Sequence, residues 1–122
     1  MKNGKPTLVI GANTDPSKYA YKAIKRLRGS DHPVIAFGPR PGVVDDVTIE
    51  NEWNESWDID TVTLYINPTR QPEYEEKIIS LHPKRVIFNP GTENPAFMRE
   101  LRQNGIEAEM ACTLVMLATD QY

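Results

Sequence analysis

The 122-residue chain contains a single cysteine, Cys112, so an internal disulfide is impossible and a zinc site built from thiolates is disfavoured. Long apolar runs are also missing, since the longest ones fall far short of the roughly 20 residues that a membrane span needs. The polar start leads directly into a short strand-like run, and no signal peptide is recognisable. We therefore expect a cytoplasmic protein that folds as one domain over residues 1–122 without covalent or metal staples.

An excess of positive charge is lacking as well, because the net charge is −3, which gives no support to non-specific nucleic-acid binding. The charge is unevenly distributed, however. Residues 1–40 carry eight Lys or Arg and two Asp, whereas residues 41–122 carry six Lys or Arg and fifteen Asp or Glu. A basic first third suits an anionic small ligand. The alternative is that its lysines and arginines form the solvated face of a helix.

No set of residues suggests acid–base, nucleophilic or metal chemistry, so we expect neither catalysis nor a metal. His32 and His82 each precede a proline where a strand is expected to begin, which is typical of loop residues. Cys112 follows an apolar stretch and is interpreted as a structural thiol. Acidic residues between positions 45 and 60 lack the spacing of a calcium loop. Trp53 and Trp57 are expected to cover the edge of the sheet, or alternatively to contact a partner.

Short apolar runs alternate with segments of helical periodicity, which predicts an α/β fold. We expect a single Rossmann-like domain of three layers, with a five- or six-stranded, mainly parallel sheet and helices on both faces. Ligands bind such sheets beyond the carboxyl ends of the strands, where the strand order reverses. The predicted strands are 7–10, 33–37, 47–49, 61–66, 85–88 and 106–110, and the predicted helices are about 17–28, 72–81, 95–104 and 113–118.

The loop after the first strand is the best candidate for a phosphate site. Gly11 permits a sharp turn close to a pyrophosphate, and the next helix presents unpaired N–H groups and the positive end of its dipole. Asn13, Thr14 and Ser17 offer amide and hydroxyl donors, and Lys18 offers a cation. Only the first glycine of the G-x-G-x-x-G pattern is present, so a simple turn is the alternative.

Gly38, Pro39 and Arg40 follow the second strand. NAD-binding folds have an acidic residue there for the ribose hydroxyls, whereas an arginine accommodates a ribose phosphate. The planar guanidinium group matches phosphate geometry. Arg40 therefore favours coenzyme A or NADP over NAD, and an exposed loop arginine without a ligand is the alternative.

These residues resemble the small stand-alone CoA-binding proteins, which are similar to the N-terminal CoA-binding domain of the succinyl-CoA synthetase alpha subunit. That family opens with Gly-Ala-Ser-x-Asp-Pro-Ser-(Lys/Arg) after a strand, and the chain has Gly11-Ala12-Asn13-Thr14-Asp15-Pro16-Ser17-Lys18. The family's Asn-Pro-(Arg/Lys) is matched by Gly38-Pro39-Arg40. A strand leading to a cysteine resembles the stretch from Gly105 to Cys112, and the likeness covers residues 7–117.

The resemblance implies a CoA site with the first loop beside the phosphates and Pro39-Arg40 beside the ADP moiety. Loops at 67–68 and 89–91 would line the remainder. It does not imply the synthetase's chemistry, because the catalytic histidine of that enzyme belongs to a further domain. The expected binding residues are Gly11, Ala12, Asn13, Thr14, Ser17, Lys18, Pro39, Arg40, Asn67, Pro68, Asn89 and Gly91.

The leading hypothesis is a nucleotide-binding protein that takes coenzyme A or an acyl-CoA as its small-molecule ligand, with neither nucleic acid nor a membrane as partner. One alternative is an NADP-binding oxidoreductase-like fragment. Another is an interaction module that has kept the fold without a ligand and uses Trp53, Trp57 and the acidic segment.

Overall fold

The computed structural model describes residues 4–122, whose strands form one seven-stranded sheet in the order β3-β4-β2-β1-β5-β6-β7. Only β3 and β4 are antiparallel, and all other neighbours are parallel. The predicted Rossmann-like α/β fold is confirmed, with one strand more than the six predicted. The strands are β1 (Thr7–Ile10), β2 (Val34–Phe37), β3 (Gly42–Val44), β4 (Val47–Glu50), β5 (Thr61–Leu64), β6 (Arg85–Phe88) and β7 (Glu107–Met110).

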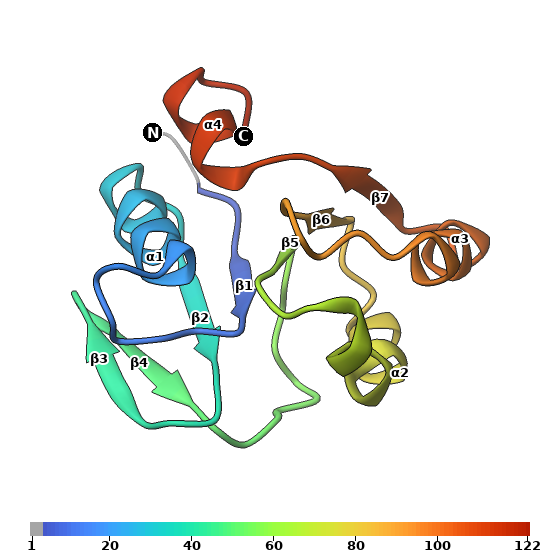
Figure 1. Ribbon diagram of the computed structural model, residues 1–122, viewed down its shortest axis with the longest axis horizontal. Helices are drawn as coiled ribbons and strands as arrows, with labels where there is room; N and C mark the ends of the chain where they lie inside the picture. The colour runs from blue at the N-terminus through green and yellow to red at the C-terminus, as the bar shows by residue number, and fades with distance from the viewer. Residues whose placement is uncertain (1–3) are drawn as a thin grey trace.

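Helices cover both faces of this sheet and give the predicted three layers (Figure 1). The first and last helices lie together on one face, and the two middle ones lie on the other. A short 3₁₀ turn, η1, leads from β5 into the second helix. The elements are α1 (Tyr19–Gly29), η1 (Pro68–Arg70), α2 (Pro72–Leu81), α3 (Pro95–Gln103) and α4 (Thr113–Ala118).

Two apolar layers hold the helices to the sheet. On one face Ile24 and Leu27 of α1 pack with Val9 of β1. On the other face Ile78 of α2 and Leu101 of α3 pack with residues of β1, β5 and β6. All four residues of β1 and of β5 are buried, as expected for parallel strands covered on both sides. The centre of the sheet therefore forms the rigid base from which the loops at its carboxyl edge project.

The strand missing from the prediction, β3, forms an edge hairpin with β4. Its turn contains Asp45, which adopts φ 53°, and Asp46. Lys25 Nζ lies 2.8 Å from an Asp45 carboxylate oxygen, and Arg28 Nη2 lies 2.9 Å from one of Asp46. The basic face of α1 thus neutralises part of the acidic block that follows it. No Lys or Arg occurs between residues 41 and 60, and the fold instead brings in bases from about 20 residues earlier in the chain.

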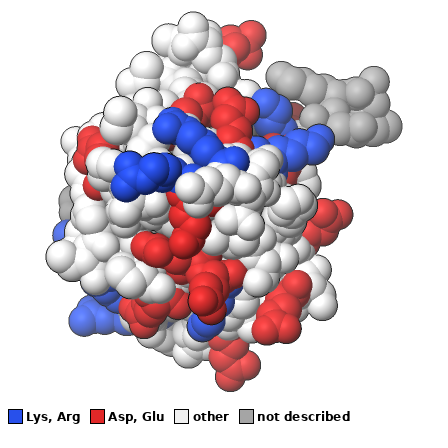
Figure 2. Space-filling model, turned by 90° about the vertical axis from the view of Figure 1, so that its right-hand side faces the viewer, with Lys and Arg blue, Asp and Glu red and all other residues white. Residues whose placement is uncertain are grey.

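The α2 and α3 side of the molecule displays much of the acidic excess (Figure 2). Acidic side chains make up most of the charged surface in that view, and Lys and Arg gather mainly toward one end. Within residues 4–122, no helix is long and apolar enough to cross a membrane.

Candidate functional site

A cleft of about 440 Å³ lies where the strand order reverses, between the carboxyl ends of β1 and β5. Its position is the one expected for a ligand site in an open parallel sheet. Its size is in the range of small-molecule sites. All four predicted loops contribute to the lining, together with residues of the adjoining strands and helices. The lining residues are Ile10, Gly11, Ala12, Asn13, Lys18, Tyr19, Ala20, Phe37, Gly38, Pro39, Tyr65, Ile66, Asn67, Arg70, Tyr74, Pro90, Gly91 and Thr92.

Two glycines let these loops approach one another. Gly11 adopts φ +93°, and a Cβ atom there would lie 2.6 Å from the Tyr65 carbonyl oxygen. A Cβ atom on Gly38 would lie 2.5 Å from the Ala12 carbonyl oxygen. Both contacts are far too short for a side chain, so glycine at these positions is required by close packing of the loops after β1, β2 and β5.

The first loop is organised by its own side chains. The Asp15 carboxylate accepts hydrogen bonds from the Ser17 backbone N–H at 2.9 Å and from its hydroxyl at 2.8 Å. These bonds, the backbone one first, lower the pKa of the Asp15 carboxyl. Asn13 Oδ1 in turn accepts from the Asp15 N–H at 2.8 Å. The predicted helix start at residue 17 is two residues early, because these turns delay α1 to Tyr19.

The amino-terminal end of α1 faces the cleft, and the Asp15 carboxylate in the preceding loop lies close enough to Lys18 to interact with it electrostatically. Its first turn contains no acidic residue, and its N-cap residue, Lys18, lines the cleft. No side chain caps this end of the helix. The N–H groups and the ammonium group of Lys18 together form a site suited to an anion.

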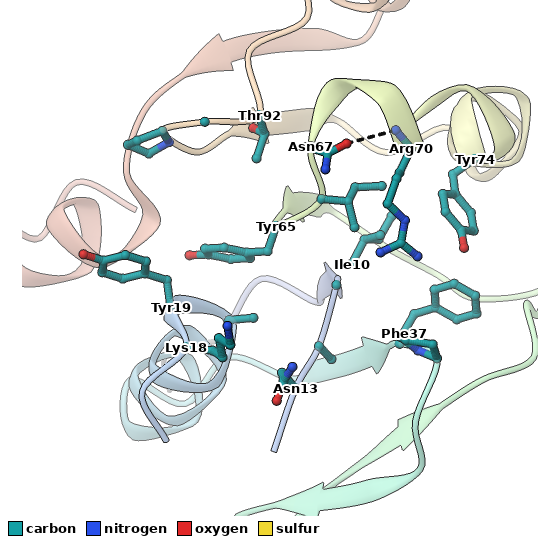
Figure 3. A pocket seen from close by; sticks show the side chains of 18 residues that line it. Ile10, Asn13, Lys18, Tyr19, Phe37, Tyr65, Asn67, Arg70, Tyr74 and Thr92 are labelled. Atoms are coloured by element: carbon teal, nitrogen blue, oxygen red, sulfur yellow. Dashed lines mark hydrogen bonds between the residues drawn. The ribbon is translucent and has the colours of Figure 1, made fainter. Parts of the chain in front are cut away.

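Arg70 is the cleft cation that sequence reasoning missed. It ends η1, whose N-cap Asn67 accepts a hydrogen bond from the Arg70 backbone N–H at 3.2 Å (Figure 3). The guanidinium group extends into the cleft toward Phe37, opposite Asn13 and Lys18. The signal was present in the sequence, because Asn67-Pro68 is a capping pattern that starts a turn immediately after a strand.

Gln71, also missed, fixes the walls on this side. Its side chain is fully buried and its Nε2 donates to the carbonyl oxygens of Ile66 at 3.1 Å and Thr92 at 2.7 Å. Its Oε1 accepts from Asn94 Nδ2 at 2.9 Å. One amide therefore joins the loop after β5 to the loop after β6, and both of these loops line the cleft.

Aromatic rings close the end of the cleft beside β2. Phe37 meets Tyr74 edge-on at 5.6 Å between centroids, and Trp53 edge-on at 5.3 Å. Trp57 packs against the same ring at 6.3 Å. Burial raises the pKa of the Tyr74 hydroxyl. Trp53 and Trp57 therefore pack around Phe37 at the carboxyl end of β2, which is an interior strand of the sheet.

The structure brings together most of the predicted binding residues, but not all of them. Thr14 is turned toward β3, where its methyl group packs on Gly42, and the Ser17 hydroxyl is bonded to Asp15. Arg40 is exposed and follows the lining residue Pro39. Lining the cleft are Gly11, Ala12, Asn13, Lys18, Pro39, Asn67 and Gly91, whereas Thr14, Ser17, Arg40, Pro68 and Asn89 do not line it.

Asn89 has a structural role at the carboxyl edge of the sheet. Its side chain is buried, and its Nδ2 donates to Thr63 Oγ1 at 2.7 Å and to the Leu64 carbonyl oxygen at 2.9 Å. The predicted ligand-binding amide is therefore already bonded to β5. Within residues 4–122, no three His, Cys, Asp or Glu side chains gather in a way that would hold a metal ion.

Comparisons with known proteins agree with this architecture. A family described as CoA binding domain matches residues 5–118. A crystal structure described only as that of an uncharacterized protein is 46% identical, with a TM-score of 0.95, and the match covers 99% of this chain and 100% of that chain. A comparison with curated proteins finds no match.

Two more distant structures show the same fold. The structure of cell-free ID.343 from Thermus thermophilus is 20% identical, with a TM-score of 0.86, and the match covers 98% of this chain and 91% of that chain. A hypothetical protein from Pyrococcus horikoshii OT3 is 22% identical, with a TM-score of 0.83 and coverage of 95% and 83%.

Proposed function

The chain belongs to the CoA binding domain family, and on that premise we propose that its cleft binds coenzyme A. The observation that carries the proposal is the pairing of two cationic elements across one cleft. The amino-terminal end of α1 with Lys18 lies on one side, and Arg70 lies on the other. A diphosphate between them would be neutralised from both sides.

The nucleotide end of the ligand has a matching environment beside β2. Phe37 and Tyr74 offer ring faces and edges to an adenine, and Pro39 continues the same wall. Arg40 follows Pro39 on the exposed rim, where its guanidinium group would meet the 3′-phosphate of coenzyme A. In this proposal the protein binds its ligand in the cytoplasm without transforming it.

Isothermal titration with coenzyme A and with NADPH, side by side, tests the proposal. We expect coenzyme A to bind in a one-to-one complex and NADPH to bind at least tenfold more weakly. Tighter binding of NADPH would favour the oxidoreductase-like alternative. Failure of both nucleotides, together with a stable oligomer in solution, would favour the interaction module that uses Trp53 and Trp57.

A further inference from the structure

A second, smaller cavity of about 200 Å³ opens beside the cleft. We call it the side chamber, and it is lined by Tyr19, Tyr65, Asn89, Pro90, Cys112 and Leu114. Three of these residues, Tyr19, Tyr65 and Pro90, also line the cleft, so the two cavities share a wall. Both tyrosine rings point away from Arg70 and toward the α4 side (Figure 3).

The order of the strands aligns the two cavities along one edge of the sheet. Phe37 ends β2, Gly11 follows β1, Tyr65 follows β5 and Pro90 follows β6, so the cleft spans these four strands. The side chamber continues from β6 to the segment after β7, which contains Cys112. From β1 to β7 there are three strand spacings, or about 14 Å. That distance is comparable to an extended pantetheine arm.

The chamber has the character of a site for an apolar group with one polar anchor. Tyrosine and proline rings, a leucine and a thiol form most of its wall. The hydroxyl of Tyr65 is buried, and although the Thr63 and Thr113 hydroxyls lie near it, it forms no hydrogen bond of normal geometry with the described residues. A buried polar atom without a partner is costly, and native proteins rarely retain one. The hydroxyl therefore retains an unused donor, which a ligand can take up once the ring moves enough to expose it.

We infer that the side chamber receives the acyl group of a short-chain acyl-CoA, with the Tyr65 hydroxyl donating a hydrogen bond to the thioester carbonyl oxygen. This inference rests on the proposed function, because the nucleotide must lie over β1 and β2 for the thiol end to reach β6 and β7. The acyl chain then packs against Leu114 and Cys112. The ligand class is a thioester with a small apolar acyl group rather than free coenzyme A.

Calorimetry with stable analogues tests the inference without acyl transfer to the thiol of Cys112. The probes are coenzyme A, S-propyl-CoA, and the dethia ketone analogue of butyryl-CoA, in which a methylene group replaces the sulfur. Each buried methylene raises affinity about fourfold, so S-propyl-CoA should bind at least about tenfold more tightly than coenzyme A. The ketone should bind more tightly still, and Tyr65→Phe should remove that additional gain.

A variant that fills the chamber, compared with a matched control, tests whether the preference for S-propyl-CoA arises in the chamber. In the Leu114→Trp variant, S-propyl-CoA should bind no more tightly than coenzyme A. Val115→Trp, at an exposed position of the same helix, should keep the preference. The inference that the chamber receives the acyl group would be contradicted if the wild type bound S-propyl-CoA and coenzyme A equally well. It would also be contradicted if the preference for S-propyl-CoA persisted in Leu114→Trp. Neither result would contradict the proposed function. If no CoA compound binds, the proposed function fails and the chamber inference fails with it.

Discussion

Asn89 Oδ1 accepts a hydrogen bond from the backbone N–H of Thr113 at 2.9 Å. The same side chain donates to Thr63 and Leu64, so one amide joins the ends of β5 and β6 to the start of α4. Thr113 is itself fully buried, and its hydroxyl lies 2.8 Å from that of Thr63. This hydrogen-bond network therefore stabilises the wall that the cleft and the side chamber share.

Replacing Asn89 with alanine should destabilise the protein substantially. The substitution leaves the Thr113 N–H and the Leu64 carbonyl oxygen buried without a partner, at a cost of about 2–3 kcal/mol. Urea unfolding followed by circular dichroism measures the change. Asn104→Ala is the matched control, because its exposed amide donates only to the Glu100 carbonyl oxygen, and we expect about 0.5 kcal/mol or less. Equal losses in the two variants would contradict the structural role of Asn89.

Arg70→Ala should weaken coenzyme A binding by roughly tenfold to a hundredfold, since a hydrogen bond to a charged group contributes about 1.5–3 kcal/mol. Arg70→Lys keeps the charge but loses the planar fork, and should fall between the alanine variant and the wild type. Calorimetry at constant ionic strength provides the affinities. Arg99→Ala, which removes an exposed arginine of α3, controls for net charge and should leave binding unchanged.

Arg40→Ala should discriminate between two ligands instead of weakening both. We expect a loss of several-fold for coenzyme A and almost none for dephospho-CoA, which lacks the 3′-phosphate. The reason is the position of Arg40 on the rim beyond Pro39, outside the part of the cleft that faces the diphosphate. A parallel loss for the two ligands would show that Arg40 does not meet the 3′-phosphate.

The fold was largely predictable because its signals are local. Buried strands such as Thr7–Ile10 read as apolar runs, and α3 has clear helical periodicity. The site was predictable where it depends on the backbone, as at Gly11. The site was not predictable where a polar side chain can form hydrogen bonds either with a ligand or with residues distant in the sequence. Nothing near Asn89 in the sequence indicates that Thr113, 24 residues later, captures its amide. Likewise, nothing near Asp45 in the sequence indicates that Lys25, 20 residues earlier, pairs with its carboxylate.

Tyr65 should make the protein less stable in alkali. Burial raises the pKa of its hydroxyl to about 12, and nearby Thr113 and Thr63 offset part of the rise. The unfolded chain ionises first, near pH 10. Ionisation of Tyr65 therefore leaves the free energy of unfolding unchanged below pH 10. As the pH rises from 10 toward 12, it lowers that free energy by about 2–3 kcal/mol.

The Tyr65→Phe variant tests both the loss of stability in alkali and the cost of the buried hydroxyl. Without the ionisable hydroxyl, the decline in unfolding free energy between pH 10 and 12 should be shallower than in the wild type. At neutral pH the variant should be more stable by about 1 kcal/mol, because an unpartnered buried hydroxyl is removed. Tyr19→Phe, at an exposed tyrosine, should change neither quantity. A destabilised Tyr65→Phe at pH 7 would mean that the hydroxyl has a partner in the folded protein.

Tyr122 should limit access to the side chamber by anchoring the chain segment that follows α4. Its ring lies against the Arg85 guanidinium at 4.5 Å and beside the His32 ring at 4.8 Å between centroids. Its hydroxyl bonds to Thr7, and its backbone oxygen accepts from Lys5 Nζ at 2.7 Å. These contacts hold the segment after α4 against the amino-terminal edge of the sheet, while the other end of α4 forms the chamber wall.

Tyr122→Ala should loosen α4 and expose the chamber, because it removes the packing on Arg85 and His32 together with the hydroxyl. Cys112 is the chain's only cysteine, so its rate of alkylation by iodoacetamide, followed by mass spectrometry under native conditions, reports on that wall. We expect labelling to accelerate at least several-fold. Tyr122→Phe keeps the ring and should accelerate it much less. Unchanged labelling in Tyr122→Ala would mean that α4 is held by its own contacts with α1 and not by this anchor.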